Sequence, residues 1–340
     1  MIMLKKIIPA GLLFSGLILI NAQSQAGCSV NSSGNVSIGK VPSITLAESG
    51  VQSSEFSAGL GCTSYLTLFT NSYMYYRVDY LPVNFINSVT GERITVKYFD
   101  AQNNAISEGQ GRNIGGWRLI DLFSGPSGTV QFRAVIDPGQ NVSPGIYKSE
   151  KSFRVKWWYS VPALGLGPIT TYFNSTGLWR VLVLGPIGGY GNGDDASIDL
   201  NLEVLPDCRI TNNDVNFGTA AFATAFEPVQ TSMGVRCSVK TPYNVGLNNG
   251  LYPQSGNQRA MKAVNSNNFL RYEIYKNSTT DRWGSNGAEK WSSSNATTNA
   301  GIYDAKTQQG YTFTTKILEN NPDNLPADKY SDTVTVQVEF

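Results

Sequence analysis

The sequence predicts an all-β protein of two Ig-like Greek-key β-sandwich domains, the second lacking its final strand. Three observations predict this class. Short β-branched and aromatic runs are separated by Gly, Pro, Asn and Ser, no long amphipathic helical pattern occurs, and part of the sequence is repeated. The clearest strand-like runs are Arg93 to Phe99, Thr129 to Ile136, Tyr272 to Lys276 and Tyr311 to Ile317.

Residues 1–26 have the organisation of a secretory signal peptide. Lys5 and Lys6 precede an apolar run from Ile7 to Ile20, and a polar stretch then leads to Ala26. The apolar run is shorter than the roughly 20 residues that cross a bilayer as a helix. We therefore expect cleavage after Ala26, export of the chain and no membrane span.

Composition argues against several classes of function. The chain has a formal net charge of +1, and only 15% of its residues are charged, so there is no electrostatic signature of nucleic-acid binding. It contains no histidine, which removes the usual nucleophile systems and the commonest metal ligand. We expect no catalytic residues, no metal and no cofactor, although a two-carboxylate glycosidase stays open.

The four cysteines predict two disulfides, Cys28–Cys62 and Cys208–Cys237. Export permits disulfide formation. A zinc site is the alternative, but no two of these cysteines have the close spacing of a zinc knuckle. Each disulfide would close one loop within one half of the chain.

An internal repeat divides the chain into two domains. The copies open with Cys28-Ser-Val-Asn and Cys208-Arg-Ile-Thr, and Pro144 to Tyr147 corresponds to Pro326 to Tyr330 farther along. The boundary falls near Leu205-Pro206-Asp207. We expect an N-terminal adhesion domain over residues 27–205 and a C-terminal domain over residues 206–340.

The two copies end differently. The second ends with an alternating apolar strand, whereas the first continues beyond the matching strand, about Lys148 to Tyr159, to a second alternating strand from Ala196 to Val204. The first domain should therefore carry its own closing strand, and the second should lack one. An open sheet edge must be covered, and a strand from another chain could cover it. Alternatively, the second domain needs one strand fewer. The alternating residues of the final strand are Val334, Val336, Val338 and Phe340.

Several motifs of the second half occur together in one known family. They are Val215-Asn-Phe-Gly218, Thr241 to Leu247, Leu270 to Tyr275, Trp283-Gly284 and Tyr330 to Val336. With them, the second half resembles the spore coat protein U family, the pilin fold of archaic chaperone–usher fibres. A two-domain member with a diverged first domain looks like a tip adhesin of Csu-type pili.

This resemblance implies partners and a location. The chain would be exported through the periplasm to the pilus tip at the cell surface, with a periplasmic chaperone and an usher assisting assembly. The final strand would receive the chaperone and then the donor strand of the next pilin subunit. The fibre would serve surface attachment and biofilm formation. Because Cys28 would follow the cleavage site by one residue, we expect this subunit to end a fibre.

Three apolar segments of the first domain predict a surface-binding end. The first comprises Val161, Pro162, Ala163, Leu164, Gly165, Leu166, Gly167, Pro168 and Ile169. The second comprises Leu184, Gly185, Pro186, Ile187, Gly188, Gly189 and Tyr190. The third, in an insertion after Cys62, contains Leu68, Phe69, Tyr73, Met74 and Tyr75. Strand counting puts these loops at the end distant from the second domain, where they would contact a hydrophobic abiotic or biotic surface. The loop from Leu122 to Pro126 is a weaker candidate.

Three alternatives stay open. The apolar loops could be buried against each other. The chain could be a lectin-type adhesin for a host glycan, using Tyr190 with Asn192, Asp194 and Asp195, or Trp117 with Arg112 and Arg118. It could also be a purely structural coat or shaft subunit.

Overall fold

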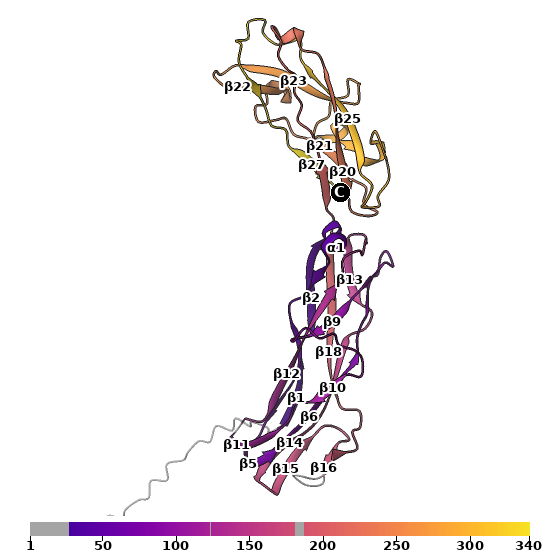
Figure 1. Cartoon of the computed structure of the whole chain (residues 1–340), viewed down its shortest axis with the longest axis vertical. Helices are drawn as coiled ribbons and strands as arrows, with labels where there is room; N and C mark the ends of the chain where they lie inside the picture. The colour runs from indigo at the N-terminus through magenta and orange to yellow at the C-terminus, as the bar shows by residue number, and fades with distance from the viewer. Residues whose placement is uncertain (1–26, 123, 181–186) are drawn as a thin grey trace, which may run out of the picture.

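The computed structural model describes residues 27–122, 124–180 and 187–340. They form two β-sandwich domains placed end to end (Figure 1), which confirms the all-β prediction. The predicted signal peptide, residues 1–26, lies outside the described residues, as do Leu184, Gly185 and Pro186 of the second apolar segment. Within the described part of the chain, no helix is long and apolar enough to cross a membrane.

One sheet of the first domain is centred on β12. It contains β1 (Gly27–Ser32), β4 (Phe56–Thr63), β12 (Ser127–Ile136), β9 (Lys97–Asp100) and β3 (Val51–Gln52). The helix α1 (Ser43–Ser49) connects β2 (Asn35–Pro42) to β3 at the end that faces the second domain (Figure 1).

The other sheet contains the strand that closes the first domain. Its order is β10 (Gly111–Asn113), β6 (Tyr73–Tyr80), β14 (Phe153–Leu166), β18 (Asp194–Leu205), β13 (Gly145–Ser149), β7 (Asn84–Asn87) and β8 (Arg93–Thr95). The strand β2 (Asn35–Pro42) pairs with β18 in parallel, while β14 and β13 pair with it antiparallel. The far end carries β5 (Leu66–Asn71), β11 (Trp117–Leu122), β15 (Ile169–Asn174), β16 (Trp179–Arg180) and β17 (Ile187–Gly188).

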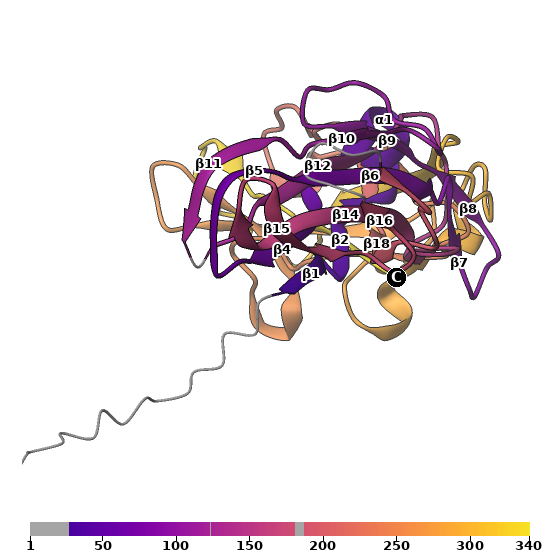
Figure 2. The same cartoon turned by 90° about the horizontal axis from the view of Figure 1, so that it is seen from below.

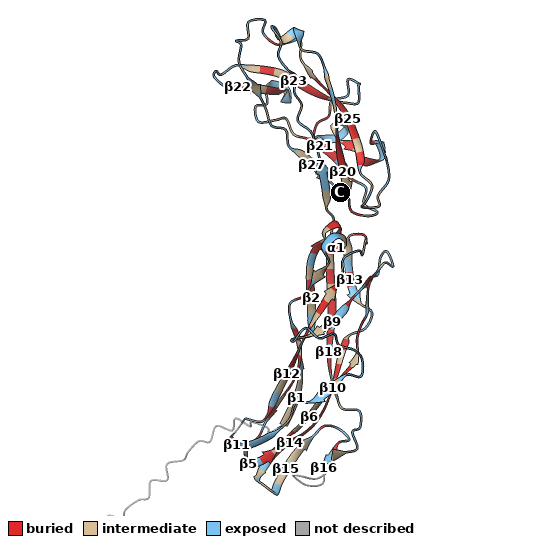
Figure 3. Ribbon diagram, viewed as in Figure 1, coloured by how far each residue is buried: buried red, intermediate tan, exposed pale blue. Residues whose placement is uncertain are grey.

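Aromatic side chains join the two sheets of the first domain. Phe56, Tyr98 and Phe132 come from one sheet and Phe153 from the other, and their ring centroids lie 4.9–6.5 Å apart. All four are buried, as Figure 3 shows for the inner strands. Such clusters add edge-to-face attraction to the burial of apolar area.

Both predicted disulfides are present. Cys28 and Cys62 are direct cross-strand partners in β1 and β4. Cys208 and Cys237 are direct cross-strand partners in β19 (Cys208–Thr211) and β20 (Val229–Cys237) of the second domain. The equivalent position of the two bonds reflects the sequence repeat. Each bond closes a loop within its own domain and so lowers the conformational entropy of the unfolded chain.

The second domain also has two sheets. The larger has the order β19 (Cys208–Thr211), β20 (Val229–Cys237), β25 (Gln309–Ile317), β23 (Phe269–Lys276), β22 (Arg259–Ala263) and β26 (Tyr330–Ser331). The smaller has the order β24 (Trp291–Ser292), β21 (Asn244–Leu247) and β27 (Val336–Glu339). Four short 3₁₀ turns lie in the described loops: η1 (Ala223–Ala225), η2 (Ser255–Asn257), η3 (Gly287–Glu289) and η4 (Ser293–Asn295). Trp283, Trp291, Tyr311 and Phe313 form the aromatic core.

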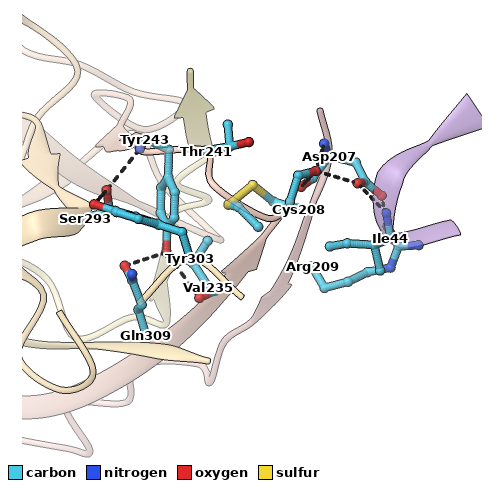
Figure 4. The surroundings of a disulfide bond; sticks show 12 residues. Ile44, Asp207, Cys208, Arg209, Val235, Thr241, Tyr243, Ser293, Tyr303 and Gln309 are labelled. Atoms are coloured by element: carbon cyan, nitrogen blue, oxygen red, sulfur yellow. Dashed lines mark hydrogen bonds and ion pairs between the residues drawn. A yellow bond between two sulfur atoms is a disulfide. The ribbon is translucent and has the colours of Figure 1, made fainter. Parts of the chain in front are cut away.

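Polar contacts connect the two domains around Asp207. Its carboxylate accepts a hydrogen bond from the amide of Ile44 in α1 at 2.9 Å and another from the hydroxyl of Ser238 at 3.0 Å, beside the Cys208 disulfide (Figure 4). Glu48 of α1 pairs with Arg236 at 2.9 Å. Charged and polar groups from both domains therefore meet at this junction.

Candidate surface-binding site at the far end of the first domain

Four strands form a sheet beyond the sandwich, at the end distant from the second domain (Figures 1 and 2). The strand β11 pairs with β5, β5 pairs in parallel with the last residues of β14, and β14 pairs with β15. The segment predicted as an apolar loop is therefore mostly a β-hairpin. Its turn is only Gly167-Pro168, and Gly167 has a φ of +48°, which favours glycine at the first turn position.

Apolar side chains occupy two adjacent rows on one face of this sheet. Directly paired residues point to the same side of a sheet, so the pairing places Ile120, Leu68, Leu166 and Ile169 in one row. Leu122 pairs with Leu66, which lies beside Leu164 in the next row. We call this set the tip face: Leu66, Leu68, Ile120, Leu122, Leu164, Leu166 and Ile169.

The tip face is open to solvent. Six of its side chains are 41–84% exposed, and Leu68 is half-buried. Thr67 and Asp121 alternate with these residues along β5 and β11, and both are buried on the other side of the strands. Asp121 is held there by an ion pair with Arg118 at 2.9 Å. This sheet therefore presents apolar side chains outward and covers polar ones, the reverse of an ordinary surface sheet.

Four predicted binding residues are buried, and their assignment to the binding surface is wrong. Val161, Pro162 and Ala163 belong to the part of β14 that still lies within the sandwich, so their side chains are covered. Met74 packs in the core from β6. Only the portion of the first segment from Leu164 onward leaves the core.

Three of the remaining predicted residues, Tyr73, Tyr75 and Tyr190, form an aromatic group. Tyr73 and Tyr75 are half-buried on β6, with parallel rings 6.3 Å apart, and the Tyr73 hydroxyl lies 3.4 Å from that of the exposed Tyr190. Burial, aided by the hydrogen bond with Tyr190, raises the pKa of Tyr73. Ile187 and Gly188 are half-buried in β17, while Gly189, Pro168 and Phe69 are exposed. Gly165 and Gly167 are half-buried.

Sequence reasoning missed several exposed residues of this end. Ile120 and Leu119 lie in β11, whose only residue predicted for apolar surface binding was the last, Leu122; Trp117 and Arg118 were predicted only for glycan contact. The run from Trp117 to Leu122 is rich in large apolar residues, and this was the available signal. Trp179 was also missed; it is 51% exposed and lies against Gly188 and Gly189, where any side chain would overlap its ring.

Several residues proposed for glycan contact have partners within the chain. Asp195 pairs with Lys156 at 3.2 Å, and Lys156 also donates to the carbonyl oxygen of Asn192 at 3.0 Å. Arg118 pairs with Asp121. Arg112 lies on β10 opposite Tyr76, whereas Trp117 lies on β11 opposite Asn71. Glycan binding by either set stays a prediction.

A second candidate site is an unpaired strand edge in the second domain. By the repeat, β13 and β14 correspond to β26 and β27. β13 pairs with β7 and β18, and β14 pairs with β6 and β18, among other strands. Among the described strands, β26 pairs only with β22 and β27 only with β21. In the described part of the chain, no strand of the second domain therefore fills the place that β18 has in the first.

The predicted donor-strand residues lie along this edge. Val334, Val336 and Val338 are half-buried and pack against the core of the second domain. Phe340 is 55% exposed and lies beyond the end of β27. The apolar row beside the open edge is thus formed by the three valines.

Comparison with known proteins gives a consistent family. The Spore Coat Protein U domain family matches residues 194–337. A chain of the CsuC–CsuE chaperone–tip adhesion subunit pre-assembly complex from the archaic Csu pili of Acinetobacter baumannii is 47% identical, with a TM-score of 0.64. The match covers 92% of this chain and all of that one.

Two more distant structures were also found. The CupB6 tip adhesin from Pseudomonas aeruginosa is 11% identical, with a TM-score of 0.33 and coverage of 92% of this chain and 94% of that chain. The CooA pilin subunit from enterotoxigenic Escherichia coli is 9% identical, with a TM-score of 0.28 and coverage of 52% and 98%. No curated protein matches. On the strength of the 47% identity over nearly the whole chain, the protein belongs to the spore coat protein U family, among the tip adhesins of archaic, Csu-type chaperone–usher pili.

Proposed function

We propose that this fimbrial adhesin attaches its pilus to hydrophobic surfaces through the tip face, and that this attachment serves biofilm formation. The observation that supports the proposal most directly is the two rows of apolar side chains on the exposed face of β11, β5, β14 and β15. Exposed apolar patches of this kind on a monomer commonly mark an interaction site.

The expected attraction is large enough for attachment. Removing about 300 Å² of apolar surface from water contributes roughly 7 kcal/mol before entropic costs. The side chains lie on paired strands rather than on open loops, so little backbone conformational entropy is lost on contact. Many fibres acting together would add avidity. The tip face offers apolar contact rather than directional hydrogen bonds. Such contact suits binding to plastics and lipid-like material.

The test is adhesion of fibres carrying Leu164→Asp, Leu166→Asp and Ile169→Asp together. We expect binding to polystyrene to fall at least tenfold, because three charges would have to be desolvated on contact. Val89→Asp is the matched control, because Val89 is 90% exposed in the β7–β8 connection, away from the tip face. Unchanged binding of the triple variant would reject the proposal. Retained binding to a glycan array in the triple variant would favour the lectin alternative.

We further propose that the open edge of the second domain is covered by partners in turn. A periplasmic chaperone would cover β26 and β27 before assembly at the usher, and the next pilin subunit would then supply a donor strand. The similar Csu protein was solved in a pre-assembly complex with its chaperone. The unpaired β27 edge and the row Val334, Val336 and Val338 support the same arrangement here.

This second proposal is tested at two adjacent positions of β27. Val336→Asp should abolish co-purification with the chaperone and presence on fibres, because the charge would lie in the apolar row beside the open edge. Gln337→Asp should leave both unchanged, because Gln337 is exposed on the other face of the strand. Equal behaviour of the two variants would count against strand donation at this edge.

A further inference from the structure

The strand β18 has all its pairing partners in the first domain. It pairs with β2 along one edge and with β14 and then β13 along the other. The inward side chains of β18 are at most 2% exposed. They are Ala196, Ile198, Leu200, Leu202 and Val204. By contact and burial, β18 is therefore a central strand of the first domain.

By the family match, however, β18 is grouped with the second domain. It leads through Pro206 and Asp207 directly to Cys208, which opens the second copy of the repeat. The match to the Spore Coat Protein U domain begins at residue 194, the first residue of β18, and continues to residue 337. The family unit thus includes a leading strand that makes no strand pairing with the rest of that unit in this structure.

The first copy of the repeat is structurally complete only when β18 is added. Its last two strands, β13 and β14, correspond to β26 and β27, and β18 pairs with both of them. The equivalent edge of the second domain is without a partner strand among the described residues. The two domains therefore need the same missing element, and only the first obtains it within the chain.

We propose that β18 is a donor strand that the second domain supplies to the first within one chain. The junction between the domains is then a covalently closed copy of the contact between two successive subunits. The segment that leads into β18 then connects the donor strand to the chain of the first domain. Its described end, Gly189 to Gly193, is glycine-rich and largely exposed, and three of its glycines have positive φ.

The proposal predicts that the chain connection before β18 is dispensable for holding the domains together. A protease recognition sequence is inserted between Gly191 and Asn192 of the full chain, and the folded protein is cut there. The two fragments should elute together in size-exclusion chromatography without denaturant, because β18 stays attached to the second domain and inserted in the first. Separation of the fragments under these conditions would overturn the proposal.

A cut on the other side of β18 provides the contrast. The same recognition sequence between Pro206 and Asp207 leaves β18 in the first domain but removes its link to the second. These fragments should separate after cutting, because β18 no longer links them and the described polar contacts around Asp207, Glu48 and Glu92 should be too weak to hold two separate fragments. If they too stay together, the polar junction rather than β18 holds the domains, and the proposal fails.

Two neighbouring substitutions in the chain cut after Gly191 test whether strand insertion is the holding interaction. Ile198 is fully buried and Ser197 is exposed. Ile198→Ala should lower the urea concentration at which the fragments separate, whereas Ser197→Ala should leave it unchanged. Neither substitution removes a backbone group that pairs β18 with its neighbours. Correct folding of each variant before cutting can be checked by disulfide formation. An equal effect of the two substitutions would contradict insertion of the apolar face.

Discussion

Glu92 connects the two domains and anchors the end of the first. Its carboxylate accepts hydrogen bonds from the Ser143 amide at 3.0 Å and the Tyr147 hydroxyl at 3.1 Å, and it pairs with Lys240 of the second domain at 2.7 Å. Burial opposes ionisation of this carboxyl, but the hydrogen bonds from Lys240 and Ser143 outweigh burial and lower its pKa to about 2.

A pH dependence follows from the depressed pKa of Glu92. The folded pKa lies below the unfolded value, so ionised Glu92 stabilises the folded state fully above about pH 4.5, and this contribution is lost as the pH falls towards 2. Glu92→Gln should therefore lower the free energy of unfolding at pH 7, with the difference from wild type shrinking near pH 2. Urea denaturation of both proteins between about pH 2 and pH 7 measures this difference in the free energy of unfolding. An equal difference at both pH values would contradict this account.

Arg259 is a fully buried cation in the second domain. It donates to the carbonyl oxygens of Asn248, Leu247 and Trp283 at 2.8–2.9 Å and pairs with Glu273. Burial lowers the pKa of Arg259 while Glu273 favours its charge.

Arg259→Met should destabilise the second domain strongly. It leaves three carbonyls and the Glu273 carboxylate without this donor, a loss of about 3–5 kcal/mol for breaking a buried pair. Thermal unfolding monitored by tryptophan fluorescence measures the effect, since Trp283 and Trp291 lie in this core. Lys262→Met on the same strand is the control, because Lys262 is only half-buried and has no carboxylate partner among the described ion pairs. Similar losses in the two variants would argue against the network.

At the scale of the element, the β14–β15 hairpin fixes the shape of the tip face. Gly165 has a φ of +152°, and a Cβ atom there would overlap the carbonyl oxygen of Ile169 in the facing strand. Gly167 has a φ of +48° but open space around it. The first glycine thus permits close pairing of the strands, and the second permits the turn.

Gly165→Ala should reduce adhesion to polystyrene although it removes no apolar side chain. The added methyl group would push Ile169 away from Leu166 and break the row across the strands. Gly116→Ala is the control, because Gly116 precedes β11 of the same end, has no positive φ, and has no atom within 4 Å of an added Cβ. Fibre adhesion with equal surface expression measures both. If Gly165→Ala adheres as well as wild type, the paired geometry is unimportant and apolar content alone decides binding.

At the scale of the whole molecule, ion pairs orient the domains. Glu48 lies 2.9 Å from Arg236 and 3.5 Å from Arg209, and Lys240 pairs with Glu92. The two pairs of Glu48 are substantially exposed, so each contributes little to stability and is weakened by salt, whereas Glu92 is more covered. We expect the pairs together to restrict the angle between the domains.

Glu48→Gln combined with Lys240→Gln should widen the distribution of interdomain angles without lowering the unfolding midpoint of either domain by more than a few degrees. Small-angle X-ray scattering measures the distribution, and high salt should reproduce the change in wild type. Lys97→Gln is the control, because Lys97 pairs with Asp137 within the first domain. An unchanged scattering profile in the double variant would show that Asp207 and its hydrogen bonds to Ile44 and Ser238 suffice.

The sequence alone determined the features that depend on local pattern. Cysteine spacing predicted both disulfides, and alternation from Ile198 to Val204 and from Val334 to Val338 marked the apolar faces of the two terminal strands. These predictions succeed because a strand repeats every two residues, so its buried face is written in consecutive positions.

Only the tertiary structure decided which apolar residues reach solvent at the tip. Val161 and Leu164 belong to one apolar segment, yet Val161 is buried and Leu164 is exposed, because β14 leaves the sandwich between them. Ile120 joins the tip face through pairing with Leu68, far away in the sequence. Exposure depends on which distant strands cover a face, and a local pattern contains no record of that covering.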